Sequence, residues 1–258
     1  MNVEEYLRKD YVTKLIKENR RIDNRGLDEF RELKIEKGYS KEKAPGSAFV
    51  SLGDTKVMVG ISLDVGSPYP DRPEDGVMTT SVELRPIASP LFETGPPREN
   101  AIEIARVVDR GIRESGTIDL KKLYIEEDKV WVAFIDIHAI DDGGNLLDAA
   151  GIAAIAALLD TRLPKYEDET VIRGEWDGKL PLTSTPIPVT HVKIGDKLVI
   201  DPTLDEEYAK DTQLTVTTTD TINAMQKSGI GEFKSDEIDK IIEASFAKAS
   251  DLRKKIED

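Results

Sequence analysis

Residues 130–158, VWVAFIDIHAIDDGGNLLDAAGIAAIAAL, decide the fold of this chain. The opening residues, Val130–Ile140, are apolar at nearly every position, which is typical of a strand buried on both faces. The DDGGN segment that follows has the composition of a tight turn. The run from Ala149 has small side chains all round, which predicts a helix packed closely on several sides. A buried strand that leads into a buried helix indicates a chain of mixed α and β structure.

Upstream of this stretch, Glu99–Glu114 is the clearest amphipathic helix in the sequence. Arg106, Arg110 and Arg113 are spaced three or four residues apart, so they share one helical face, and Arg98 stands just before the helix. Guanidinium groups match phosphate oxygens, so this row could follow a nucleic-acid backbone. The alternative is a solvated face held by ion pairs of the spacing Glu103 to Arg106 and Asp109 to Arg113.

Two further helices are predicted, at about residues 3–18 and 235–257. Strands are predicted at residues 32–36, 47–52, 55–65, 77–85, 170–176, 187–193, 198–201, 214–219 and 221–227. Gly-Asp turns at Gly53 and Gly195 lie in similar surroundings and hint at a duplicated unit. No linker long enough to separate two domains is visible, so we expect one domain over residues 1–258.

The composition excludes several classes of protein. The chain has 258 residues, with 36 Lys and Arg against 50 Asp and Glu, a net charge of −14 and a pI near 4.8, so bulk charge does not attract nucleic acid. Without cysteine there are no disulfides, zinc thiolates or thiol nucleophiles. His138 and His191 lie in predicted strands and are expected to be structural, and Trp131 and Trp176 are expected in the core. No apolar stretch reaches the ~20 residues of a membrane span, so we expect a cytoplasmic protein without a membrane partner.

Two groups of acidic residues could carry chemistry. Asp201, Asp205, Glu206, Glu207 and Asp211 follow a predicted strand, where carboxylates can hold Mg²⁺ or act as a general acid, or can be solvated surface.

The second acidic group, Asp136, Asp141, Asp142 and Asp148, surrounds the Gly143-Gly144 turn. Glycines before a helix can hold an anion, but the acids would repel one, and Asp148 also suits the N-cap of the helix.

Five stretches in order along the chain carry a family resemblance. They are RRIDNRGLDEFR (20–31), GSAFVSLGDTKVMVGI (46–61), VELRPIASPLFETGPPRENAIEIARVVDRGIRES (82–115), FIDIHAIDDGGNLLDAAGIAAIAAL (134–158), and VIDPTLDEEYAKDTQLTV with INAMQKSG (199–229). Together they resemble the RNase PH family, and most closely its non-catalytic members in the archaeal exosome ring. The resemblance implies an α+β (α/β-like) RNase PH fold: two βαβα-type halves with mixed sheets and with helices packed between them.

The resemblance also implies a reaction and a reason why this chain would not perform it. Catalytic members use phosphate to attack the 3′ end of RNA, and the turn after their buried strand ends in Ser or Thr and Arg, which hold the phosphate. Here Leu146 stands in place of that Arg. Catalytic members also carry an Asp that is thought to act as the general acid. Here Gln213 stands in its place, unless the alignment slips by two residues and Asp211 takes that position. We therefore expect no catalytic residue, metal or cofactor.

What the family resemblance does carry over is an RNA-binding role for Arg106 and Arg110, and less directly for Arg113 and Arg98. It implies a catalytic RNase PH-like paralogue as partner, in a hexameric ring of three heterodimers that binds single-stranded RNA and RNA-binding cap subunits. Two alternatives stay open at this point: a self-sufficient phosphorolytic 3′–5′ exoribonuclease, and a purely structural scaffold.

Overall fold

The computed structural model describes residues 3–40, 42 and 44–257. Its larger sheet has six strands in the order β1-β2-β3-β6-β4, with β5 added beside β6. The strands are β1 (Leu33–Lys37), β2 (Gly46–Leu52), β3 (Thr55–Gly66), β4 (Val77–Glu83), β5 (Tyr124–Glu126) and β6 (Lys129–Asp141). Only β4 and β6 pair in parallel, so this sheet is mixed, as expected from the sequence.

A second sheet of four strands has the order β10-β9-β11-β12, and β7 and β8 form a separate hairpin. These strands are β7 (Arg162–Glu167), β8 (Thr170–Lys179), β9 (Ile187–Ile194), β10 (Lys197–Ile200), β11 (Thr212–Thr218) and β12 (Ile222–Ser228). Every pairing in the four-stranded sheet is antiparallel, which differs from the expectation that both sheets are mixed. Two of these pairs, β9–β10 and β11–β12, are hairpins, whose short connections allow only antiparallel neighbours.

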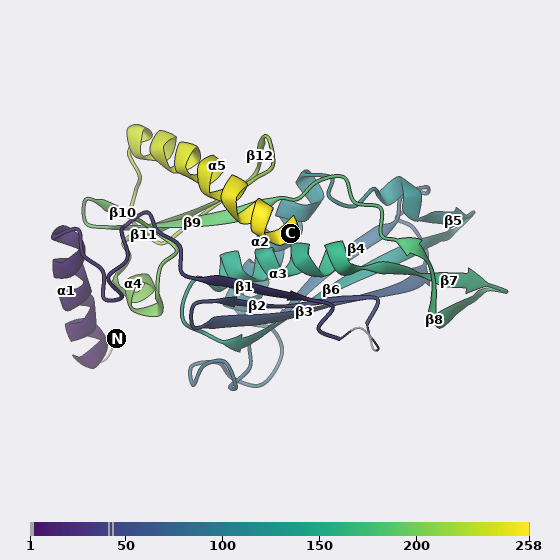
Figure 1. Ribbon diagram of the computed structural model, residues 1–258, viewed down its shortest axis with the longest axis horizontal. Coiled ribbons are helices and arrows are strands. Elements are labelled where there is room, and N and C mark those ends of the chain that lie inside the picture. The colour runs from purple at the N-terminus through teal and green to yellow at the C-terminus, as the bar shows by residue number, and fades with distance from the viewer. Residues whose placement is uncertain (1–2, 41, 43, 258) are drawn as a thin grey trace.

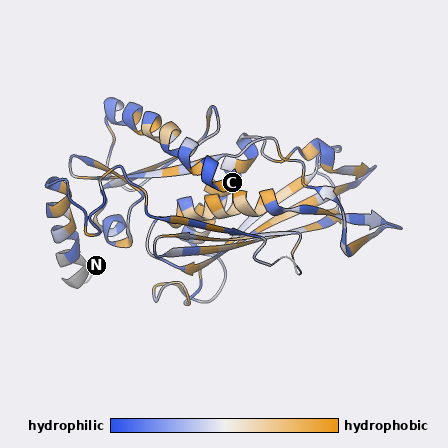
Figure 2. Ribbon diagram, in the orientation of Figure 1, coloured by the Kyte–Doolittle hydropathy of each residue, from blue (hydrophilic) through white to orange (hydrophobic). Residues whose placement is uncertain are grey.

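The helices pack between and around the two sheets (Figure 1). They are α1 (Val3–Lys17), α2 (Glu99–Glu114), α3 (Leu146–Asp160), α4 (Leu204–Ala209) and α5 (Ser235–Glu257), with a short 3-10 helix, η1 (Leu120–Leu123). α3 lies between the sheets and contacts β2, β3 and β9, while α5 covers β9 and β11. In Figure 2, α3 is hydrophobic on nearly all sides, which agrees with the burial of almost all its residues. Among the described residues, no helix combines the length and apolar character that a membrane span requires.

One buried cluster connects the two sheets through α3. It contains Ile61 and Ile135 of the first sheet, Val189 of the second, and Ala153 and Ile155 of α3, all of which are almost completely buried. Gly151 allows this close packing, because a Cβ there would lie 2.5 Å from Cγ of Pro188. We propose on this basis that the chain folds as one domain, as its sequence predicts.

Several predicted features differ in the structure. Trp131 is in the core, but Trp176 is half-buried on the β7–β8 hairpin, where the Arg162 guanidinium lies 4.0 Å from its ring centre. Only one face of β6 is fully buried, and His138 on its other face lies 3.5 Å from Glu83. On α1, Val12 and Ile16 occupy the buried side, while Tyr11 is 58% exposed.

Candidate nucleic-acid interface

The arginine row predicted from the sequence lies along the exposed face of α2. The opposite face is buried against β4 and α3 through Ala101, Val107, Val108, Gly111 and Ile112. Arg106 and Arg110 are exposed one helical turn apart, and neither has an ion pair or hydrogen bond within the described part of the chain. The predicted Glu103–Arg106 ion pair is absent there, since Glu103 Oε1 instead accepts from Gln226 Nε2 of β12 at 3.4 Å.

The other two predicted arginines are held by neighbours. Arg113 Nε donates to Asp109 Oδ2 at 3.0 Å, as its spacing predicts, and Arg113 Nη2 donates to the Met78 carbonyl at 3.2 Å. Arg98, at the N-cap of α2, forms an ion pair with Glu93. The row therefore consists of two arginines available to a ligand and two that already have carboxylate partners.

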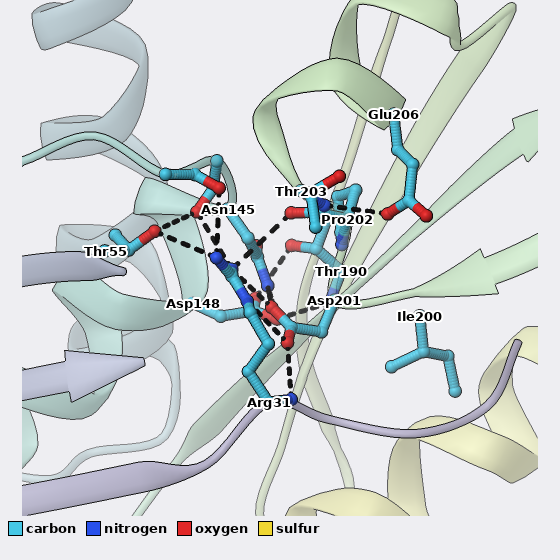
Figure 3. A network of polar contacts seen from close by, with 12 residues as sticks. Arg31, Thr55, Asn145, Asp148, Thr190, Ile200, Asp201, Pro202, Thr203 and Glu206 are labelled. Carbon is cyan, nitrogen blue, oxygen red and sulfur yellow. Dashed lines mark hydrogen bonds and ion pairs between the residues drawn. The ribbon is translucent and has the colours of Figure 1, made fainter. Parts of the chain in front are cut away.

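The acidic residues after β10 are not an open carboxylate cluster. Asp201 is fully buried and accepts from Arg31 Nη2 at 2.8 Å and from Asn145 Nδ2 at 2.8 Å (Figure 3). Burial alone would raise the pKa of Asp201, but the hydrogen bonds and charge of Arg31 outweigh burial and lower it. Glu206 is also buried and forms a bidentate pair with Arg21, at 2.8 and 2.6 Å.

The remaining members of this acidic group are also occupied. Asp205 pairs with Arg8 at 3.4 Å, and Asp211 Oδ2 accepts from the Gly195 N–H at 2.8 Å. Within the described ranges there is no group of three His, Asp or Glu side chains that could hold a metal ion.

Sequence reasoning did not identify Arg21, Arg25 and Arg31 as partners of these acids, because the segment that contains them has the composition of a turn. Arg25 Nη1 also donates to Asp201 Oδ2, at 3.0 Å. The only available signal was the density of arginines in an otherwise irregular stretch.

The turn before α3 binds the protein's own carboxylates. Gly144 has a φ of +89°, and a Cβ there would lie 2.4 Å from the Leu204 nitrogen, so the position requires glycine. Its N–H donates to Asp142 Oδ1 at 3.1 Å, and the Asn145 N–H donates to Glu207 Oε1 at 2.9 Å. Burial raises the pKa of both carboxyl groups. Two backbone donors of this turn are therefore already occupied by carboxylates.

The other acids around this turn do not converge on it. Asp136 accepts from Ser81 Oγ at 2.7 Å, and Asp141 pairs with Lys56 at 2.8 Å. Asp148 is not the N-cap that its sequence position suggested, because α3 begins earlier and Asn145 occupies the cap.

The Asp148 side chain instead connects α3 to the second sheet (Figure 3). It is completely buried, and it accepts from Asn145 Nδ2 at 2.8 Å and from Thr190 N at 2.9 Å. Burial raises the pKa of Asp148 to about 7.

A cavity of about 180 Å³ lies beside this turn, between α2, α3 and α4. Leu146 and Gln213 both line it, together with Asp142, Glu207 and Lys210. Lys210 Nζ donates to Gln213 Oε1 at 2.6 Å, so the one lysine of the lining is engaged. Asp211, which the sequence left as an alternative to Gln213, is bound to the Gly195 turn and does not line the cavity.

Comparison with known proteins identifies the class. The 3′ exoribonuclease family (RNase PH), domain 1, matches residues 29–164, and domain 2 of the same family matches residues 184–248. The chain belongs to this family, and the RNase PH fold predicted from the sequence is confirmed.

More specific relatives agree with the family assignment. The exosome complex component Rrp42 of Thermococcus kodakarensis is 52% identical, with 99% of this chain and 96% of that protein covered. A chain from the solved Archaeoglobus fulgidus exosome with RNA bound to the active site matches with a TM-score of 0.93 and 48% identity, covering 98% and 99% of the two chains. A chain of an archaeal exosome core matches with a TM-score of 0.89 and 44% identity, covering 99% and 98%.

Proposed function

We propose that this chain is a non-catalytic RNase PH-like subunit of an archaeal-type exosome, which degrades RNA from its 3′ end. In this proposal it pairs with a catalytic RNase PH-like paralogue, three such pairs close a hexameric ring, and RNA-binding cap subunits join the ring. Its own roles are to brace the active site of the paralogue and to bind single-stranded RNA through Arg106 and Arg110. The cytoplasmic location expected from the sequence stays a prediction.

The cavity beside Leu146 carries the non-catalytic part of the proposal. At this cavity a phosphate would meet the carboxylates of Asp142 and Glu207, which occupy two backbone donors of the turn. It would also meet the apolar Leu146 where catalytic members would place an arginine. A bidentate arginine makes two charge-assisted hydrogen bonds of about 1.5–3 kcal/mol each. Gln213 cannot act as a general acid, whose loss costs typically ~10²–10⁴ in rate. Together these losses leave no useful phosphorolysis by this chain.

The first test is phosphate-dependent shortening of a single-stranded oligoribonucleotide. The purified chain, with folding checked by circular dichroism, is assayed alone, the paralogue is assayed alone, and then both are mixed. We expect no shortening by this chain and more activity in the mixture than from the paralogue alone. Shortening by this chain alone would contradict the proposal and support a self-sufficient exoribonuclease.

The second test concerns the RNA-binding role of α2. In the reconstituted ring, the double variant Arg106→Glu/Arg110→Glu should weaken RNA binding at least about tenfold at low salt, since two charge-assisted contacts are reversed. The dependence of log affinity on log salt should flatten by about 1.4, at ~0.7 per phosphate contact of a single strand. Lys240→Glu/Lys254→Glu on α5 is the matched control, because both lysines are exposed in weak surface ion pairs. Equal affinity of the two double variants would favour a purely structural scaffold.

A further inference from the structure

A second cavity, of about 260 Å³, opens at the C-terminal end of α2. Met78 from β4, Ile112 from α2 and Leu120 from η1 give it an apolar lining. The Gly76 N–H donates to the Leu120 carbonyl at 2.8 Å, which fixes the start of β4 against η1. The walls are therefore held by backbone contacts, and the cavity is formed before any ligand arrives.

Four charged side chains line the same cavity: Asp75, Arg113, Asp119 and Lys121. Arg113 is held in place by its bond to the Met78 carbonyl at 3.2 Å. Neither Lys121 nor the Asp75 carboxylate has an ion-pair partner within the described residues. The next residue, Lys122, differs in this respect, since it pairs with Asp119 at 3.2 Å. The cavity thus offers an apolar space, an unpaired cation and an unpaired hydrogen-bond acceptor.

The position of the cavity continues the arginine row. With a rise of ~1.5 Å per residue, Arg106 and Arg113 lie about 10 Å apart along α2. A strand that follows Arg106 and Arg110 toward the C-terminal end of the helix therefore reaches the cavity. The end of a helix carries partial negative charge, so a phosphate is favoured at Lys121 on η1 and not at the last turn of α2.

We propose that this cavity is a subsite for one nucleotide of single-stranded RNA. The base lies against Met78 and Leu120, its phosphate pairs with Lys121, and its exocyclic amino group donates to Asp75. Adenine, cytosine and guanine carry such an amino group and uracil does not, so the subsite favours the first three. This inference rests on the proposed RNA-binding function and adds a position and a base preference to it.

The test uses the ring reconstituted with the catalytic paralogue, without phosphate, and fluorescence anisotropy with 5′-labelled oligo(A) and oligo(U) of equal length. Lys121→Glu should weaken binding of oligo(A) about fivefold, since one exposed phosphate contact is reversed. The salt dependence should flatten by about 0.7. Lys255→Glu makes the same change of charge at an exposed lysine of α5, outside the cavity lining, and should retain nearly the original affinity.

Base preference gives an independent readout. The original ring should bind oligo(A) more tightly than oligo(U), and Asp75→Asn should bring the two affinities together, because the introduced amide donates as well as accepts. Unfolding of each variant is followed by circular dichroism to confirm that the fold persists.

Equal losses for the variants at Lys121 and Lys255, or a base preference that survives Asp75→Asn, would overturn the subsite. If only Arg106→Glu/Arg110→Glu loses affinity, the subsite is rejected while the proposed function stands. If that double variant also binds normally, the RNA-binding function itself is rejected.

Discussion

Replacing Arg31 by alanine is expected to lower the free energy of unfolding by about 3–5 kcal/mol, because the change leaves a buried carboxylate without its main partner. Arg31 donates to Asp201 through Nη2, Nε and its backbone N–H, at 2.8, 3.0 and 2.8 Å. It also bonds the carbonyls of Gly143 and Gly144 at 3.0 Å each. One side chain therefore connects the approach to β1, the turn before α3 and the end of β10 (Figure 3).

Urea denaturation of the variant, followed by circular dichroism, measures this loss. Lys34→Ala is the control. Lys34 forms an ion pair with Glu32, both side chains are largely exposed, and such surface pairs contribute only about 0–1 kcal/mol. A second substitution, Asp201→Asn, should return part of the stability of Arg31→Ala, since it removes the uncompensated charge. If Arg31→Ala costs no more than the control, the pair does not stabilise the fold as we describe.

The same network shows where prediction from the sequence ends. α2 was expected at Glu99–Glu114 and is found there, because the periodicity of apolar residues reports on neighbours within a few turns. Arg31 and Asp201 are 170 residues apart, and Arg21 and Glu206 are 185 apart. No local pattern encodes such pairs, so the arginines had the appearance of a polar turn. α4 was missed for a related reason, since its acidic residues were interpreted as a site.

The candidate site was predicted in part. Leu146 and Gln213 are visible in the sequence as departures from the family pattern, and the structure places both at one cavity. The sequence did not indicate that Glu207 would occupy the N–H of Asn145, which depends on how α4 folds back over the turn. The sequence also left Asp211 as an alternative to Gln213. The structure distinguishes the two, because Asp211 contacts the Gly195 turn and Gln213 lines the cavity. The types of residue at this cavity were predictable from the sequence. The direction in which each side chain points was not, because it depends on how the two sheets pack against each other.

Two buried groups should give the stability of this protein opposite pH dependences. Burial lowers the pKa of His191 to about 4 from 6.5, so the unfolded chain binds more protons between these values and stability falls as pH falls through them. Burial raises the pKa of Asp148 to about 7 from 3.8, so the native state holds its proton longer and stability falls as pH rises through that range. At about 1.4 kcal/mol per pKa unit, the two effects are about 3 and about 4 kcal/mol, and they nearly cancel between pH 4 and 6.5.

Single substitutions should expose each dependence. Relative to the original chain, Asp148→Asn should lose about 3 kcal/mol between pH 6.5 and 4.5, because it lacks the stability that the original chain gains when native Asp148 holds its proton. The amide retains the shape of the side chain, and Thr190 Oγ1 can accept from it because Thr215 Oγ1 lies 2.8 Å away as an alternative partner. His191→Leu should show the opposite slope and gain stability as pH falls. Urea denaturation at intervals of half a pH unit measures both, and the difference from the original chain at each pH cancels the other titrating groups. A difference that does not change with pH for Asp148→Asn would show that Asp148 titrates alike in the folded and unfolded chain, and that burial does not control its charge.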